Sequence, residues 1–357
     1  MLDVDDQLLE WALKYIPGEV RLSPQSVLTA ASGDAGFRHY FRLNSEPSLL
    51  AVYAPPAQEN NLDFVRKAEV LRRHGLRVPV IHAVDFEQGF LLIEDLGTLH
   101  CLDLLDDRSF AAVYDLADDV LLNLQGCPAD EALFPVYDHA LLQMELRLFP
   151  EWFLERLLGL PLEGEAKGQF ERLEQLLIES ALEQPQVLVH RDYHSRNLMV
   201  MTDSAARPKA LGVIDFQDAV RGPVTYDVVS LYRDCYIRWS DEQVAARAEL
   251  YLSRAVAAGV MPAVESTQFQ RWFDLMGLHR HIKVLGVFAR LWLRDGKSRY
   301  LADLPLVMRY TLEVARRYEA FRDFAVWFER EVVPRAAECA WYRPWQTAGD
   351  RIFEDCV

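Results

Sequence analysis

Short apolar runs dominate the first hundred residues, and helical repeats dominate the residues that follow. A helix is predicted over about residues 4–17, where apolar side chains recur at three- and four-residue steps before Pro17-Gly18. Apolar and β-branched runs separated by turn residues then predict five strands. These strands are expected near residues 27–30, 40–43, 49–53, 80–84 and 90–93, with one helix among them at 62–74. The pattern predicts a small antiparallel sheet lobe with one main helix over residues 1–96.

The remaining residues, 97–357, have a mainly helical pattern. Apolar positions repeat at three- and four-residue intervals in four stretches, namely 110–124, 141–158, 170–182 and 275–292. Two short β-type runs, at 187–189 and 211–214, interrupt this pattern. We therefore predict an α+β protein with two lobes, in which the larger C-terminal lobe, residues 97–357, is mainly helical.

The composition is that of a globular protein that binds neither nucleic acid nor membranes. The chain has 357 residues, of which 51% are hydrophobic and 26% charged, and it is long enough for two lobes. Its formal net charge of −16 opposes binding to nucleic acid and anionic membranes, which favour Lys and Arg surfaces. No run of about eighteen apolar residues predicts a membrane span, and the acidic start is unlike a signal peptide. Five scattered cysteines without a C-x-x-C pair indicate a reducing compartment, so we expect a cytoplasmic protein, and a monomer.

Two short polar motifs, each next to an apolar β-type run, hold the candidate chemistry. The first is H-x-D-x-x-x-x-N, which places His190, Asp192 and Asn197 after the run at 187–189. The second is an Ile-Asp-Phe triplet, whose Asp215 follows Asp192 by 23 positions (215 − 192). Residues at strand ends are well placed to converge on one point.

Phosphoryl transfer needs this set of groups. It requires an acceptor for the proton of the attacking hydroxyl and hard oxygen ligands that hold Mg²⁺ on the nucleotide phosphates. Asp192 is therefore predicted as the catalytic residue, and Asn197 and Asp215 as metal ligands. A lone H-x-D is common, and an aspartate after a strand usually caps a turn or a helix. Both motifs at this spacing are far rarer and match the kinase signatures.

A glycine-containing loop at residues 31–38 joins the first two predicted strands. Its glycines allow main-chain N–H groups to surround phosphate oxygens, so Ser32, Gly33 and Gly36 are predicted nucleotide contacts. The alternative is a simple hairpin loop, because the G-x-G-x-x-G pattern is missing.

The third predicted strand lacks the lysine that grips phosphates in kinases. Tyr53 stands where that lysine is expected, and Arg38 or Arg42 is the candidate replacement. Where the last strand leaves the lobe, the main-chain carbonyl of Glu94 and the N–H of Leu96 are expected to bind the adenine edge. The alternative is a simple linker between the two lobes, which would look the same in sequence.

The segment after Asp215 is short, because only ten positions part Phe216 from Tyr226 (226 − 216). That leaves no room for the long activation segment with which protein kinases hold a polypeptide, so we expect a small-molecule acceptor. Asp227 begins a helix and is interpreted as a structural cap on the catalytic loop. Asp218 stays a candidate acceptor contact.

Further candidates for acceptor contacts lie on two predicted helices. In the first helix, Phe149 and Phe153 are interpreted as a core stripe. Glu145 and Trp152 are candidates to face the acceptor, Trp152 by stacking on a sugar. In the second helix, three basic residues flank a buried seam, namely His279, Lys283 and Arg290. Such a stripe usually lies beside the buried seam and is exposed to solvent, which we call a solvated shoulder. The alternative is a wall of the acceptor pocket, where Gly286 makes room.

Taken together, these motifs resemble the aminoglycoside phosphotransferase and choline kinase branch of the protein-kinase-like fold, over nearly the whole chain. The motifs that carry the resemblance lie at residues 190–197 and 214–219. More narrowly, residues 146–153, 226–232 and 277–290 are similar to the bacterial anomeric kinases of N-acetylmuramate and N-acetylglucosamine.

The resemblance implies ATP and Mg²⁺ as cofactors and an amino-sugar substrate phosphorylated at its anomeric (C1) hydroxyl, in the recycling of peptidoglycan sugars from the cell wall. It also implies that loss of the strand lysine is tolerated. Two other functions stay open. An aminoglycoside or choline-type phosphotransferase suits the negative charge, and a non-catalytic nucleotide-binding protein suits the missing lysine. The basic residues at 279, 283 and 290 instead favour an acceptor with a carboxylate, such as the lactyl group of N-acetylmuramate.

Overall fold

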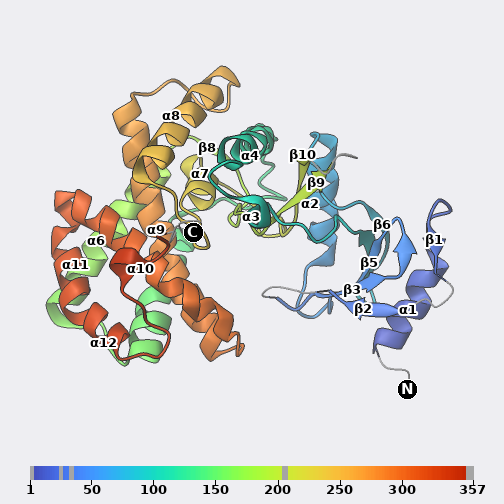
Figure 1. The fold of residues 1–357 in the computed structure, drawn as a ribbon, viewed down its shortest axis with the longest axis horizontal. Coiled ribbons are helices and arrows are strands. Elements are labelled where there is room, and N and C mark those ends of the chain that lie inside the picture. The colour runs from blue at the N-terminus through green and yellow to red at the C-terminus, as the bar shows by residue number, and fades with distance from the viewer. Residues whose placement is uncertain (1–3, 24–26, 32–35, 203–207, 351–357) are drawn as a thin grey trace, which may run out of the picture. The chain divides into compact units, whose positions relative to one another are not determined.

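The computed structural model describes residues 4–23, 27–31, 36–202 and 208–350. The chain divides into two compact units, each built from two stretches of sequence: Met1–Cys127 with Arg196–Asp218, and Pro128–Ser195 with Ala219–Val357. The first unit contains a five-stranded antiparallel sheet, and the second is mainly helical (Figure 1). The predicted α+β fold class is confirmed.

The first unit extends past the boundary that the sequence predicts after residue 96. The Val200 N–H donates a hydrogen bond to the Leu99 carbonyl at 2.8 Å. The His100 ring nitrogen Nδ1 lies 2.7 Å from the Arg196 carbonyl oxygen. These contacts attach a hairpin from much later in the chain to the residues that follow the sheet, and a strand pattern read along the sequence does not predict them.

The sheet of the first unit has the strand order β2-β3-β5-β7-β6, and every neighbouring pair is antiparallel. Its strands are β2 (Leu28–Ala30), β3 (His39–Leu43), β5 (Leu49–Tyr53), β6 (Ile81–Asp85) and β7 (Phe90–Glu94). All five strands predicted from the sequence are present. The inner strands β5 and β7 are apolar along almost their whole length, as expected for strands covered on both faces.

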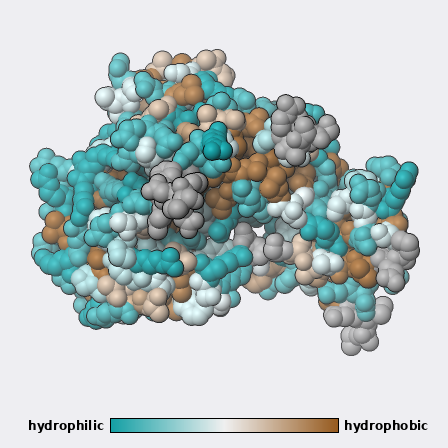
Figure 2. Space-filling view, viewed as in Figure 1, coloured by the Kyte–Doolittle hydropathy of each residue, from teal (hydrophilic) through white to brown (hydrophobic). Residues whose placement is uncertain are grey.

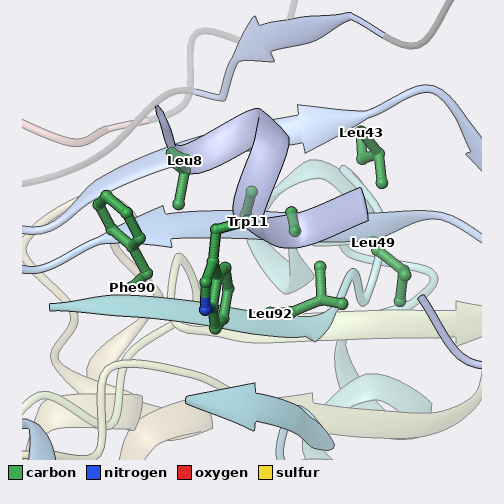
Figure 3. Packing of buried hydrophobic residues seen from close by; sticks show 8 residues of the cluster. Leu8, Trp11, Leu43, Leu49, Phe90 and Leu92 are labelled. Atoms are coloured by element: carbon green, nitrogen blue, oxygen red, sulfur yellow. The ribbon is translucent and has the colours of Figure 1, made fainter. Parts of the chain in front are cut away.

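Helix α1 (Val4–Lys14) packs on one face of this sheet. Leu8 and Trp11 of α1 point towards Phe90 and Leu92 of β7, and the Trp11 and Phe90 ring centres are 5.8 Å apart (Figure 3). The same buried cluster includes Leu43, Leu49 and Ala51 of the neighbouring strands. Burying each large apolar side chain contributes about 1.5–3 kcal/mol, and this burial holds the helix on the sheet.

The other elements of the first unit are β1 (Arg21–Leu22), β4 (Ser45–Glu46), α2 (Asn61–Arg73), α3 (Cys101–Leu104), α4 (Phe110–Gln125), β9 (Leu198–Thr202) and β10 (Pro208–Val213). Asn60 caps the start of helix α2, and its side chain accepts the Asp63 N–H at 3.1 Å. Asn61 donates to the Ala54 carbonyl at 2.8 Å, so the helix starts close to the end of β5. Strands β9 and β10 form an antiparallel pair, and α4 packs on β10.

The second unit is built around one long helix, α9. Its elements are α5 (His139–Leu146), η1 (Phe149–Leu157), α6 (Gly164–Leu182), β8 (Gln186–Val189), β11 (Val220–Pro223), α7 (Thr225–Tyr232), α8 (Asp241–Ala257), α9 (Ser266–Leu293), η2 (Ser298–Asp303), α10 (Leu304–Arg317), η3 (Glu319–Phe321), α11 (Arg322–Trp327), η4 (Phe328–Val332), α12 (Val333–Ala337) and η5 (Trp345–Thr347). Helices α5, α6, α7, α8 and α10, with η1 and η2, all pack against α9. A helix enclosed in this way is buried on all sides instead of along one stripe.

The interpretation of the basic residues on α9 as a solvated shoulder is wrong for two of them. His279 is fully buried, and only 11% of the Lys283 side chain is exposed. Gly286 does not make room for a ligand either, because a Cβ atom there would overlap the main chain of Leu148. Its missing side chain allows the segment between α5 and η1 to approach the helix.

The helix predicted over residues 141–158 is divided in two. Helix α5 ends at Leu146, and the π-helical segment η1 begins at Phe149. Pro150 explains the break, because proline lacks an N–H and its ring clashes with the carbonyl four residues earlier. The predicted core role of Phe149 and Phe153 is confirmed, since both side chains are fully buried.

Hydrophilic residues cover most of the face seen in Figure 2, and hydrophobic residues form smaller groups on it. Over the described part of the chain, no helix combines the length and the apolar character that a bilayer crossing requires. No disulfide links the described cysteines.

Candidate active site

One end of the β9–β10 pair brings two predicted site residues together. Leu198 is opposite Val213, so Asn197 and Asp215 flank the same end of the ladder. The Ile214 N–H donates to the Asn197 carbonyl at 3.1 Å, and Asn197 Nδ2 lies 3.5 Å from Asp215 Oδ2. The expected convergence of polar residues at strand ends is therefore observed for this pair.

Asp215 is held in an uncommon backbone conformation. Its φ is +65°, in the left-handed region that residues other than glycine rarely adopt. The Gln217 amide donates to Asp215 Oδ1 at 2.6 Å, and Lys67 of α2 donates to the Gln217 carbonyl at 2.6 Å. Phe216 stacks on Phe64 of α2, with ring centres 5.0 Å apart. Such conformations persist only where their surroundings fix them, and α2 supplies the fixing contacts.

Asn197 and Asp215 fit a magnesium ion by their donor chemistry. Both side chains offer hard oxygen atoms, and Mg²⁺ commonly binds one or two carboxylates together with substrate phosphates and water. In the part of the chain that the structure describes, no group of three His, Cys, Asp or Glu side chains is placed to hold a metal. An ion held by Asn197 and Asp215 would take its other ligands from phosphate and water.

Asp227 holds the start of the loop that carries Asp192. Its carboxylate oxygens accept the main-chain N–H of His190 at 2.6 Å and that of Arg191 at 3.0 Å. Burial raises the pKa of Asp227 to about 6, although the charge of His190 and the two N–H donors lower it. The interpretation of Asp227 as a structural cap is confirmed. His190 also supports the loop, because its Nδ1 accepts the Asp192 N–H at 3.3 Å.

Asp234 holds the other end of the same loop, and neither motif predicts it. Ser195 donates its main-chain N–H at 2.9 Å and its hydroxyl at 2.5 Å to Asp234 Oδ2. Asp227 and Asp234 lie on and just after α7, about two helical turns apart in sequence. One helix therefore positions both ends of the loop, and the spacing of these two acidic residues was the available signal in the sequence.

The environment of Asp192 favours the ionised form of its carboxyl group. Its side chain is partly buried. Burial raises the pKa of Asp192, but the charges of Lys283, His194 and Arg191 lower it more, and the result lies below the ordinary value of the carboxyl group. An ionised carboxylate is able to accept a hydrogen bond, and then a proton, from a hydroxyl.

Glu145 is the centre of a buried charge cluster in the second unit. Only 2% of its side chain is exposed, and it accepts hydrogen bonds from the Tyr137 hydroxyl and the Arg191 guanidinium. The Lys283 ammonium lies 2.9 Å from Glu145 Oε1 and donates to the Tyr226 hydroxyl at 2.9 Å. Burial raises the pKa of Glu145, but Lys283 and Arg191 lower it to about 2. The cluster brings two of the predicted acceptor residues, Glu145 and Lys283, into direct contact.

Arg191 connects this cluster to the loop that carries Asp192. It directly precedes Asp192 and has a left-handed φ of +75°. Asp227 binds its main-chain N–H and Glu145 binds its guanidinium, so two carboxylates fix this residue. His279 lies beside the cluster, with its ring edge-on to Tyr137 at 6.4 Å, and burial lowers the pKa of His279 to about 4.

The other predicted acceptor residues have different surroundings. The Arg156 guanidinium lies 4.0 Å from the centre of the Trp152 ring. Arg290 is partly buried, and its Nε has no hydrogen-bond partner among the described residues. Asp218 is exposed and belongs to the first unit.

The predicted phosphate contacts in the first unit differ in whether the structure describes them and in whether they already have a partner. Ser32 and Gly33 lie outside the described residues, and Gly36 is exposed with φ +140°. Arg42 is bound through two nitrogens to Asp95, with Nε–Oδ2 at 2.5 Å and Nη2–Oδ1 at 3.2 Å. This pairing occupies the Arg42 guanidinium and leaves Arg38 as the better candidate for a phosphate contact.

Glu94 and Leu96 lie at the end of β7, where the chain leaves the sheet. The Glu94 side chain is ion-paired with Arg77, and its main-chain N–H donates to the Val80 carbonyl at 2.8 Å. The Leu96 side chain packs closely over Gly212 of β10, where a Cβ atom would lie 2.6 Å from it. These contacts fix the positions of both residues.

Tyr53 points to the side of the sheet that α1 covers. Its ring lies between those of His39 and Phe90, at centre distances of 6.2 and 5.9 Å, and it packs against the α1 cluster. Successive strand residues point to opposite faces, so Leu50 and Val52 face away from α1. A lysine that reached the face opposite α1 would have to stand at one of these two apolar positions. Tyr53 points to the other face, so it does not take the place of the kinase lysine.

Comparisons with known proteins agree with the motifs. The model of the phosphotransferase enzyme family matches residues 27–263. A curated N-acetylmuramate/N-acetylglucosamine kinase from Pseudomonas putida is 46% identical over 315 residues, which cover 88% of this chain and 90% of the relative.

Two solved structures share the fold at low identity. A choline kinase from Cryptosporidium parvum has a TM-score of 0.61 at 12% identity and covers 90% of this chain and 99% of its own. An ADP-bound aminoglycoside phosphotransferase has a TM-score of 0.54 at 17% identity, with coverages of 87% and 99%. The protein-kinase-like fold and the resemblance drawn from residues 190–197 and 214–219 are confirmed. The chain belongs to the phosphotransferase enzyme family.

Proposed function

We propose that this protein is an ATP-dependent kinase that phosphorylates the anomeric (C1) hydroxyl of N-acetylmuramate and N-acetylglucosamine. The observation that carries the proposal is the pairing of Asn197 with Asp215 at the end of β9 and β10, at 3.5 Å. The name and high coverage of the Pseudomonas putida relative support the amino-sugar acceptor.

Asp192 is the proposed proton acceptor. The sugar oxygen attacks the γ-phosphorus, the bond from that phosphorus to the bridging oxygen of ATP breaks, and the hydroxyl proton passes to the Asp192 carboxylate. Its lowered pKa supports this role, because the carboxylate is unprotonated at neutral pH. Since phosphoryl-transfer transition states are loose, most of the acceleration comes from positioning and electrostatics.

Asn197 and Asp215 are the proposed magnesium ligands. When bound, the ion neutralises negative charge on the phosphates as the γ-phosphoryl group leaves. The Gln217–Asp215 hydrogen bond orients the carboxylate for this task. The main-chain carbonyl of Glu94 and the N–H of Leu96 are the proposed adenine contacts, and Gly36 belongs to the proposed phosphate loop.

The proposed acceptor contacts come from the second unit and from Asp218. Lys283 and Arg290 provide positive charge for the lactyl carboxylate of N-acetylmuramate, and the influence of Lys283 on Asp192 supports its place near the reacting group. Glu145, Trp152 and His279 complete the proposed set. The acceptor is a small molecule of the cytoplasm, in peptidoglycan recycling, and the protein acts as a monomer.

A cationic acceptor is the second candidate, and one observation favours it. The formal net charge of −16 attracts polycations such as aminoglycosides. A screen of ATP consumption over amino sugars, amino acids, choline and aminoglycosides tests both candidates, with NMR to identify the phosphorylated carbon. Phosphate at C1 of both amino sugars is the expected result. Turnover of choline or an aminoglycoside, without turnover of any sugar, would overturn the proposal.

A further inference from the structure

The face of the sheet opposite α1 lacks the cation that kinases place on this strand. Leu49 and Ala51 of β5 belong to the α1 cluster and Tyr53 packs against it, so Leu50 and Val52 point to the other face. In protein kinases a lysine from this strand, paired with a glutamate on the following helix, binds the nucleotide phosphates. Here both outward positions of β5 are apolar, and another residue must supply the charge.

The register of β3 on β5 indicates where that charge comes from. Tyr40 pairs with Val52, and both therefore lie on the face opposite α1. Burial raises the pKa of Tyr40, the charge of Arg38 lowers it, and the charges of Asp215 and Glu59 raise it. The geometry agrees, because the Arg38 guanidinium lies over the Phe64 ring and Phe64 stacks on Phe216, the residue next to Asp215.

Arg38 has a mostly buried side chain, and one of its donors meets no acceptor among the described residues. Its side chain is only 6% exposed, and its Nη2 lies 3.0 Å from Glu59 Oε2. Its Nε has no hydrogen-bond partner among the described residues. A buried N–H without a partner is unfavourable, so this donor is suited to an incoming acceptor.

Contacts around Arg38 hold it in a fixed place. Its guanidinium lies 4.7 Å from the centre of the Phe64 ring, and Phe64 stacks on Phe216, the residue after Asp215. Glu59 also accepts the Phe37 N–H at 3.2 Å, so one carboxylate fixes both the side chain of Arg38 and the main chain that leads into it.

We propose that the Arg38–Glu59 ion pair takes the place of the strand lysine and its glutamate, with the Arg38 guanidinium binding the phosphates of the nucleotide beside Asp215. The inference rests on the proposed function for its nucleotide. A guanidinium suits the task because its planar donors bind phosphate oxygens in a two-pronged geometry, and the bond to Glu59 occupies only one side of it.

The test compares nucleotides that differ only in their phosphates. Calorimetry with Mg²⁺ measures the Kd of AMP, ADP and ATP for the wild-type protein, Arg38→Gln and Glu59→Gln. Arg38→Gln is expected to weaken ADP and ATP by about 10- to 100-fold, one to two factors of ten in the binding constant. The same variant is expected to change AMP by less than about threefold, and the KM of the sugar should stay constant.

Two further variants separate the proposal from a general structural effect. Arg73→Gln removes a solvent-exposed Arg–Glu pair on α2, with Glu69, and is expected to leave all nucleotide affinities unchanged. Glu59→Gln keeps the charge of Arg38 but removes the carboxylate that holds its guanidinium in place. This variant is expected to weaken the binding of ADP by about 3- to 10-fold. If Arg38→Gln does not fold, Glu59→Gln carries the test alone.

The outcomes are distinct. Equal losses for AMP and ADP, or unchanged ADP binding in both Arg38→Gln and Glu59→Gln, would overturn the proposal. If the wild-type protein phosphorylates no sugar but its ADP affinity still depends on Arg38, the sugar-kinase function fails while the phosphate contact stands.

Discussion

The Lys67 ammonium donates a 2.6 Å hydrogen bond to the main-chain carbonyl of Gln217, and Gln217 donates through its side chain to Asp215. Lys67 is 5% exposed and lies on α2. A buried cation therefore holds the loop that carries the proposed metal ligand Asp215. Lys67 does so through Gln217 and is not itself a proposed ligand. In kinases the equivalent loop is a point of control, and here a helix of the sheet-containing unit fixes it.

Lys67→Met should weaken the magnesium site while leaving both proposed ligands in place. Loss of groups that orient a metal ligand typically costs about 10- to 100-fold in metal affinity. The Mg²⁺ concentration for half-maximal turnover is expected to rise by that factor at saturating ATP. Lys14→Met removes an exposed lysine of α1 and serves as the control. An unchanged Mg²⁺ dependence would show that the Lys67–Gln217 bond does not position Asp215.

Asp192→Asn should lower kcat by about 10²–10⁴, the usual effect of losing a general base. The amide keeps the size of the side chain but accepts no proton, so binding of ATP and of the sugar is expected to change by less than about threefold. Steady-state kinetics with both sugars measure the two parameters separately. A variant with near-normal kcat would refute the role of Asp192 as proton acceptor.

Glu145→Gln should destabilise the second unit strongly. The variant leaves the buried charges of Arg191 and Lys283 without their carboxylate, and removing one partner of a buried ion pair costs about 3–5 kcal/mol. Urea unfolding measures the change in the free energy of unfolding. The matched control is Glu151→Gln, whose exposed pair with Arg156 should contribute less than about 1 kcal/mol. Equal changes for the two variants would contradict the central place of Glu145.

His279→Gln should make the free energy of unfolding depend less on pH between about 6.5 and 4. The pKa of His279 is lowered by burial from 6.5 to about 4 in the folded protein. Between these values the unfolded chain binds a proton that the folded protein does not, so the stability is complete above about pH 6.5 and falls as the pH drops towards 4. This loss is on the order of 3 kcal/mol and is expected to be absent in the variant.

Urea unfolding of the wild type and of His279→Gln between pH 7.5 and 4.5 measures that difference. Glu145 and Asp227 titrate in both proteins, so their contributions largely cancel in the comparison. Parallel profiles would show that His279 accepts its proton in the folded state as readily as in the unfolded chain.

Arg290→Ala should discriminate between the two proposed sugars. If its guanidinium contacts the lactyl carboxylate, the KM of N-acetylmuramate is expected to rise by about tenfold or more, the usual scale for a charge-assisted hydrogen bond. The KM of N-acetylglucosamine, which has no carboxylate, should stay constant. Equal changes for both sugars would exclude the carboxylate contact.

The sequence predicted the sheet and the closeness of Asn197 to Asp215 well because both follow from local patterns. Apolar and β-branched runs predicted the five strands of the first unit, and the two strand-end motifs predicted Asn197 beside Asp215. Asp227 was recognised as a cap because it begins a helix. Each of these features follows from a local signal, namely an apolar run, a motif at the end of a strand or the start of a helix.

Features that depend on distant contacts were not predictable in the same way. Arg42 was a candidate for phosphate until the structure paired it with Asp95, 53 positions later (95 − 42). The basic stripe of α9 looked solvated because helical periodicity does not show how many neighbours enclose a helix. Tyr53 was assigned from its place in a motif, whereas its face of the strand depends on where α1 packs.

The first unit is discontinuous in sequence, because residues 196–218 complete it only after residues 128–195 have been made. A nascent chain that ends at residue 127 contains the sheet and α2 but neither Asn197 nor Asp215. Translation must therefore proceed through part of the helical unit before the hairpin that bears these residues is available. A fragment cut after the sheet would therefore lack the hairpin that bears both proposed metal ligands, and is expected to show none of the proposed Mg²⁺-dependent activity.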